Sequence, residues 1–136
     1  MHPIRALRES GHATAEKFAA LLAEDVVMHS PLLTRAILGR DAVAKTMAAS
    51  ARNRDNPGVY VLERKLDENT TFLRWKGTIE GHEFESLELL TDGPDGKLVE
   101  RTVAYRPFPA LKIFREKQHA ATGNILPPDM WDYPTS

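Results

Sequence analysis

Glu88 is the residue in this sequence whose setting most suggests chemistry. It interrupts the apolar run Leu87-Glu88-Leu89-Leu90, within a stretch, 83–91, that has the pattern of a β-strand. A charged carboxylate is costly in apolar surroundings, so Glu88 must be paired, neutral or turned toward water. If it lines a closed cavity, its pKa rises, and it can act as a general acid or as a base near neutral pH. If it lies on the outer face of the sheet, it is an ordinary surface or interface residue.

Arg101 offers Glu88 a partner. The residues Asp-Gly-Pro-Asp-Gly at 92–96 have the composition of a hairpin turn, and a regular hairpin there sets Arg101 directly opposite Glu88. A buried pair would keep Glu88 ionised, lower its pKa and favour anchoring of a substrate over acid catalysis. An exposed pair would contribute little, and a slip of one residue in the turn would separate the two side chains.

His29 is the second catalytic candidate, because it lies on a predicted strand, 25–31, and an imidazole pKa of about 6.5 suits proton transfer. Alternation along a strand places His29 and Ser30 on opposite faces. If Ser30 faces a cavity, His29 is therefore a structural or interface residue, unless Pro31 distorts the end of the strand. The chain has no cysteine, and no two histidines have metal-site spacing on one element, so we expect no metal.

Aromatic residues on the predicted strands suggest the wall of a binding site. Trp75 and Tyr105 are expected on inner faces, either as plain core or as side chains that stack on a ring-shaped ligand while the tyrosine hydroxyl donates to a carbonyl. The other expected ligand-binding residues are Met28, Ser30, Met47, Tyr60, Arg101 and Val103. No nucleotide, flavin or haem motif occurs, so we expect no cofactor.

Helices and strands with distinct periodicities must position these residues. Apolar spacing predicts helices over 3–10, 14–24, 41–52 and 107–119, and strands over 25–31, 59–66, 70–80, 83–91 and 97–106. Helices come first and short-linked strands follow, which is an α+β order. We expect one domain over 1–122, a cone-shaped, strongly curved antiparallel sheet of about five strands packed on about three to four helices, enclosing a cavity. An irregular tail, 123–136, would dock through Trp131 and Tyr133.

Composition narrows the class of protein. The chain has 136 residues, of which 42% are hydrophobic and 27% charged, values typical of one soluble globular domain. The net charge is −1 and the basic residues are spread along the chain, which argues against a nucleic-acid-binding face. The longest uncharged apolar run, 18–23, is too short to span a membrane, and the N-terminus lacks the apolar core of a secretory signal. We expect a cytoplasmic protein, which the lack of cysteine suits.

The stretches LLAEDVVMHSP at 21–31 and GRDAV at 39–43 carry a family resemblance, with further agreement at Trp75, at SLELL in 86–90 and at DGKL in 95–98. They resemble the SnoaL-like (polyketide-cyclase-like) members of the nuclear-transport-factor-two-like superfamily, over 3–120. The resemblance implies a cone-shaped fold with an internal cavity for a small molecule and a homodimer formed through the outer sheet face. It does not choose a reaction, because this fold hosts several enzymes and non-catalytic binding modules.

Ketosteroid isomerase, a member of that superfamily, gives the sharpest comparison. Its base is an aspartate directly before the proline that ends the first strand, and the matching position here is Ser30. Its oxyanion tyrosine corresponds to about Ile4, and its second acid corresponds to Glu88. Because a serine hydroxyl without an activating base does not take a proton from carbon near neutral pH, the resemblance argues against isomerisation by the usual base.

Two functions remain open at this level. The first is a cofactor-free lyase, cyclase or isomerase for a small hydrophobic or cyclic molecule, with Glu88 handling protons or anchoring a polar group. The second is a non-catalytic ligand-binding or dimerisation module that uses the same cavity. The acid in an apolar run favours the first, whereas Ser30 in place of the base favours the second.

Overall fold

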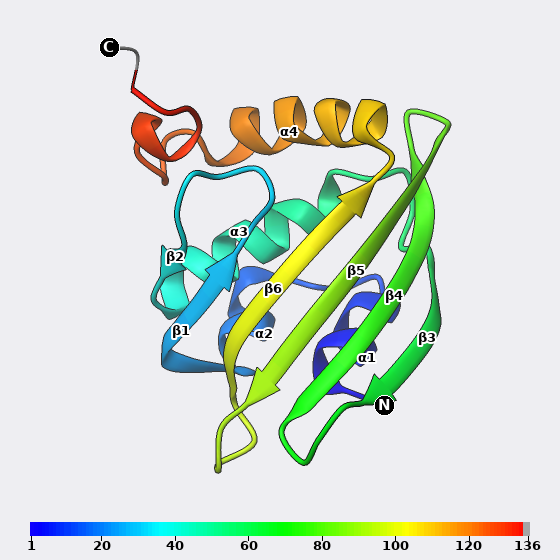
Figure 1. Ribbon diagram of the computed structural model, residues 1–136, viewed down its shortest axis with the longest axis vertical. Coiled ribbons are helices and arrows are strands. Elements are labelled where there is room, and N and C mark those ends of the chain that lie inside the picture. Colours follow the sequence, from blue (N-terminus) through cyan, green and yellow to red (C-terminus); the bar gives the residue numbers. More distant parts are fainter. Residues whose placement is uncertain (135–136) are drawn as a thin grey trace.

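A curved six-stranded sheet dominates the fold in the computed structural model, which describes residues 1–134 (Figure 1). The strands are β1 (Leu22–His29), β2 (Ile37–Leu38), β3 (Val59–Lys65), β4 (Thr70–Ile79), β5 (His82–Asp92) and β6 (Leu98–Arg106). They lie in the order β2-β1-β6-β5-β4-β3. The predicted α+β class is confirmed, but the sheet is mixed rather than fully antiparallel, because β1 runs parallel to β6.

The sixth strand is β2, in a stretch where no strand was predicted. It is two residues long, and it pairs with β1 through Val27 with Leu38 and Met28 with Ile37. So short a strand carries no readable alternation, which is why the pattern missed it.

Helices cover one side of the sheet, and α4 crosses one end (Figure 1). They are α1 (Pro3–Glu9), α2 (Ala15–Ala19), α3 (Arg40–Arg52) and α4 (Phe108–Thr122), followed by a 3-10 turn, η1 (Pro128–Met130). Thr14 caps α2, since its hydroxyl accepts from the Lys17 N–H at 3.2 Å. Helix α2 ends earlier than predicted because Leu22, part of its apolar stripe, already pairs with Leu98 in the sheet.

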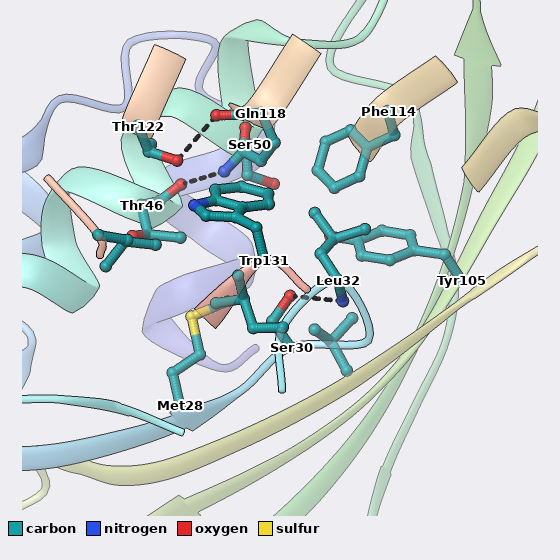
Figure 2. Close-up of a pocket in the computed structure, with 13 residues that line it drawn as sticks. Met28, Ser30, Leu32, Thr46, Ser50, Tyr105, Phe114, Gln118, Thr122 and Trp131 are labelled. Atoms are coloured by element: carbon teal, nitrogen blue, oxygen red, sulfur yellow. Dashed lines mark hydrogen bonds between the residues drawn. The ribbon is translucent and has the colours of Figure 1, made fainter. Parts of the chain in front are cut away.

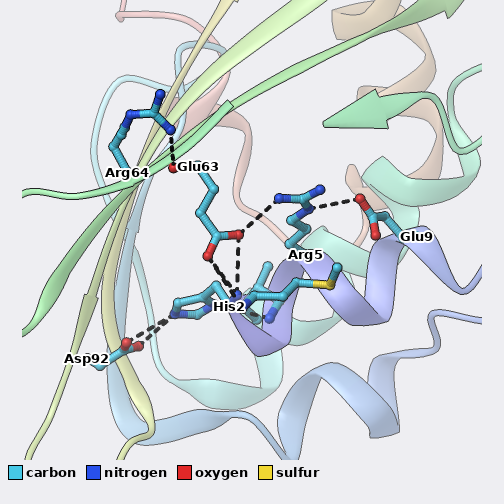
Figure 3. A network of polar contacts seen from close by, with 8 residues as sticks. His2, Arg5, Glu9, Glu63, Arg64 and Asp92 are labelled. Atoms are coloured by element: carbon cyan, nitrogen blue, oxygen red, sulfur yellow. Dashed lines mark hydrogen bonds and ion pairs between the residues drawn. The ribbon is translucent and has the colours of Figure 1, made fainter. Parts of the chain in front are cut away.

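A polar network fixes the start of α1 against the sheet (Figure 3). His2 caps the helix, since its Nδ1 accepts from the Ile4 N–H at 3.1 Å while its Nε2 lies 3.0 Å from Asp92 Oδ1. The His2 N–H donates to Glu63 Oε2 at 3.1 Å. These contacts tie α1 to β3 and β5 and so set the position of Arg8, six residues further along.

The core lies between the sheet and the helices. Its fully buried members include Ile4, Phe18, Val43, Met47 and Phe84. The tail docks through Trp131, which is 4% exposed, whereas Tyr133 is 77% exposed and does not contribute to the docking that was predicted for both residues. Within residues 1–134, no helix is long and apolar enough to cross a bilayer.

Candidate functional site

A small hollow lies between α3, α4 and the ends of β1 and β6 (Figure 2). Its volume is about 10 Å³, which is room for about one water molecule. Four of the predicted residues line it, namely Met28, Ser30, Val103 and Tyr105. The other lining residues are apolar, namely Leu32, Leu33, Phe114, Leu126 and Trp131, or polar, namely Thr46, Ser50, Gln118 and Thr122.

The polar side chains of this hollow are only partly satisfied. Gln118 donates through Nε2 to the Thr46 carbonyl at 3.0 Å, and the Ser30 hydroxyl accepts from the Leu32 N–H at 3.2 Å (Figure 2). The Thr46 hydroxyl and Trp131 Nε1 are buried, and neither has a hydrogen-bond partner among the described residues. Buried polar groups are normally paired, so these two atoms are available to a polar group inside the hollow.

Tyr105 stands beside a guanidinium at the wall of the hollow. Arg54 Nη2 lies 3.4 Å from the Tyr105 hydroxyl and donates to Ser50 Oγ at 2.8 Å. Burial would raise the pKa of Tyr105, but the positive charges of Arg54, Arg101 and Arg8 outweigh burial and lower it to about 8. The phenol is therefore mainly protonated at neutral pH and is a stronger acid than an ordinary tyrosine.

Sequence reasoning missed Arg54, a charged residue that acts on Tyr105, as it missed the polar lining residues of α3 and α4. Its guanidinium carbon lies 4.4 Å from the centre of the Trp75 ring and 5.6 Å from that of Phe114. It follows α3 in the turn-forming stretch 53–58, where an arginine is expected to be an exposed surface residue. The only available signal was the number of aromatic residues predicted to face inward, since such rings attract a cation.

Glu88 faces inward and forms an ion pair with Arg101. Glu88 Oε1 accepts from Arg101 Nη2 at 2.9 Å, and the two residues are 2% and 0% exposed. The hairpin register differs from the expected one by two residues, because Glu88 pairs with Val103 and Arg101 with Leu90. A shift by two keeps every side chain on its face, so Arg101 still reaches Glu88 along the diagonal.

This pair sets the charge state of Glu88. Burial would raise the pKa of Glu88, but Arg101, together with Arg8 and Arg54, outweighs burial and holds it below its ordinary value. Of the two alternatives that the sequence left open, a raised pKa in a closed cavity and a lowered pKa in a buried pair, the structure has the second. Glu88 is a buried carboxylate that fixes Arg101, and neither of the two lines the hollow.

The remaining predicted residues lie outside the hollow. His29 turns to the outer side, where its ring is 45% exposed and lies 2.9 Å from Glu100, so the structure does not bring it to Tyr105. Alternation along β1 explains this, because Ser30 lines the hollow. Met47, Tyr60 and Trp75 are buried in the core, but they do not line the hollow.

Comparison with known proteins shows the fold. No protein-family model and no curated protein matches the sequence. Among solved structures, an uncharacterized bacterial protein with a cystatin-like fold from Silicibacter pomeroyi is 21% identical with a TM-score of 0.81, covering 92% of this chain and 89% of that one.

Two further solved structures are similar to this chain in fold. A steroid delta-isomerase from Pseudomonas aeruginosa is 17% identical with a TM-score of 0.73, covering 91% of this chain and 94% of that one. An NTF2-like protein of unknown function from Cytophaga hutchinsonii is 15% identical with a TM-score of 0.55, covering 81% and 88%. With its curved sheet packed on helices, the chain is thus shown by these structural neighbours to have the fold of the NTF2-like, or cystatin-like, superfamily.

Proposed function

We propose that the protein binds a small, mostly apolar molecule in the hollow beside Tyr105, through a carbonyl or hydroxyl oxygen of the ligand. The observation that carries this proposal is the Tyr105 hydroxyl at the wall, acidified by Arg54 at 3.4 Å. An acidic phenol donates a strong hydrogen bond to a neutral oxygen, and the apolar lining suits the rest of such a ligand. SnoaL-like membership, which the sequence resemblance implies, is part of the same proposal.

Ligand entry requires the wall to move, because the hollow holds about 10 Å³. The segment that follows α4 supplies Leu126 and Trp131 to this wall. In its described part, up to residue 134, it pairs with no strand of the sheet, and hydrogen bonds such as that from the Thr34 N–H to the Met130 carbonyl at 2.7 Å attach it. We expect this segment to open at lower cost than the helices and strands around it.

Cofactor-free proton transfer is the second candidate function. A phenol with a pKa of about 8 can stabilise negative charge that develops on a carbonyl oxygen, as isomerisation and cyclisation require. Its fold neighbour from Pseudomonas aeruginosa is named a steroid delta-isomerase. Binding is the better supported function, because Ser30 occupies the position of the usual base and the Glu88 carboxylate is held by Arg101.

The test compares acetophenone with ethylbenzene, which has a similar shape and no oxygen. In NMR titrations of the wild-type protein, we expect acetophenone to shift the signals of Val103 and Gln118 and to bind about threefold to tenfold more weakly to Tyr105→Phe. Tyr133→Phe, at an exposed tyrosine, is the matched control. Equal binding of both compounds, or equal affinity in Tyr105→Phe, would refute the proposal.

Homodimerisation through the outer sheet face stays a prediction. On that face Leu87 and Leu89 are 38% and 42% exposed. Beside them the buried Glu85 carboxylate is held by Arg74 and Arg106. Both features suit an interface, and sedimentation velocity at rising protein concentration measures whether a dimer forms.

A further inference from the structure

In the interior between the sheet and the helices, buried positive charge exceeds buried negative charge. Arg8 is 6% exposed and Arg101 is fully buried, and Arg54 lies among aromatic rings. Glu88 is the carboxylate that pairs with this group, and its hydrogen bond goes to Arg101. The Glu88 carboxylate also acts on Arg8 and Arg54, but it offsets only one of the positive charges. Because uncompensated buried charge is costly, a bound anion would stabilise Arg8 and Arg54.

Arg8 shows the deficit at the level of single atoms. Its Nε and Nη2 are buried, and within residues 1–134 neither has a hydrogen-bond partner. The guanidinium carbon lies 5.3 Å from the centre of the Phe18 ring. This cation–π contact stabilises the positive charge, but the ring does not replace the missing hydrogen-bond acceptors of Nε and Nη2. The atoms Nε and Nη2 form the side edge of the guanidinium fork, the edge that binds both oxygens of a carboxylate.

Arg8 and Arg54 both line a site at the end of α3, away from the Tyr105 hollow. An inner space of about 20 Å³ is lined by these two arginines with Ala51, Pro57 and Trp75. An outer pocket of about 290 Å³ shares Arg8, Arg54, Ala51 and Pro57 with it. Because four residues line both spaces, the two spaces adjoin at Arg8 and Arg54 and together make up the site.

We propose that this site binds a small organic molecule that carries a carboxylate group. The carboxylate group lies against the Nε and Nη2 edge of Arg8, with Arg54 close by, and the small apolar body of the molecule lies in the outer pocket. Gly11, Ala13, Ala51 and Pro57 supply apolar wall of suitable size, and the exposed Arg52 adds positive charge at the mouth. The flat fork of Arg8 favours a planar carboxylate over a tetrahedral phosphate. A bound anion would also supply the hydrogen bonds that Arg8 lacks.

The site shares Arg54 with the function proposed above, but Tyr105 lines neither of its two spaces. Arg54 separates the two, because its guanidinium donates to Ser50 Oγ at 2.8 Å and reaches the Tyr105 hydroxyl at 3.4 Å on the side of the hollow. Tyr105→Phe should therefore leave carboxylate binding unchanged, whereas it weakens acetophenone binding. Failure of one proposal is thereby separable from failure of the other.

The experiment titrates the full chain with benzoate, benzamide and inorganic phosphate at constant ionic strength, observed by amide NMR. We expect benzoate to shift the signals of Gly11, Ala13 and Ala51, with benzamide and phosphate binding about tenfold more weakly or not at all. Arg8→Met should weaken benzoate binding by about tenfold or more. Arg8→Lys, which keeps the charge and loses the fork, should also weaken it.

Arg40→Met is the matched control, because Arg40 is exposed at the other end of α3. Equal benzoate affinity in Arg8→Met and in the wild-type protein would overturn the proposal, as would equal binding of benzamide. Phosphate that binds as tightly as benzoate would overturn the assignment to a carboxylate. If Arg8→Met does not fold, the wild-type titration still decides, since benzoate that leaves the Gly11, Ala13 and Ala51 signals unmoved refutes the site.

Discussion

The acidity of Tyr105 gives the sharpest prediction. Its pKa lies near 8, against an ordinary value of 10.0, because the charge of Arg54 at 3.4 Å and those of Arg101 and Arg8 outweigh the effect of burial. We expect Arg54→Met to raise this pKa. A unit charge at 3.4 Å, with an effective dielectric constant of about 20, is worth roughly 5 kcal/mol, or about 3 to 4 pKa units. Water that enters the vacated space reduces this figure, and we expect a rise of at least about one unit.

The assay is a titration of tyrosine ring carbons by NMR between about pH 6 and pH 11. The chain contains three tyrosines, and Tyr105→Phe identifies the signal of interest. Exposed Arg40→Met controls for the loss of one positive charge. A wild-type Tyr105 that titrates at its ordinary value or above, or one whose pKa is the same in Arg54→Met, would refute the electrostatic reasoning and remove the main support for the proposed function.

The same shift has a consequence for stability. Because folding lowers the pKa of Tyr105, the stabilisation from its ionised form is fully present above the unfolded value of 10.0 and is lost as the pH falls through about 8. A shift of two units corresponds to roughly 3 kcal/mol. Relative to Tyr105→Phe, the wild-type free energy of unfolding should therefore rise by about that amount between these two pH values, as measured by urea unfolding.

Two further substitutions test the buried pair and the cap of α1. Glu88→Gln leaves Arg101 buried without its carboxylate and should cost about 3 to 5 kcal/mol in urea unfolding, against almost nothing for exposed Glu68→Gln. Because the pKa of Glu88 is lowered, the stabilisation from its ion pair with Arg101 is present above pH 4.5 and is lost as the pH falls below it. If Glu88→Gln lowers the free energy of unfolding by less than about 1 kcal/mol near neutral pH, the pairing is contradicted. His2→Ala removes the acceptor of the Ile4 N–H and should cost about 1 kcal/mol in thermal unfolding, whereas His12→Ala, at an exposed histidine, should cost less.

The sequence predicted well those features that depend on periodicity. Apolar spacing located α1, α3 and the long strands, and alternation placed Val103 and Tyr105 on one face, whereas it left the face of Glu88 open. Glu88 and Arg101 meet although the register was misjudged by two residues, because an even shift preserves the face. The parallel pairing of β1 with β6 could not be predicted, since it joins strands far apart in the chain.

The charged interior was decided by the tertiary structure. Arg8 is one of several charged residues on a short helix, and Arg54 follows a helix in a turn, so neither has a pattern that distinguishes it from a surface arginine. Curvature of the sheet brings Trp75 and Phe84 from the strands, and α4 brings Phe114, around the Arg54 guanidinium. The sequence by itself determined the helices, the long strands and the alternation along them, whereas the closure of the sheet over the helices decided which charges meet in the interior, because that depends on distances between segments that no local pattern encodes.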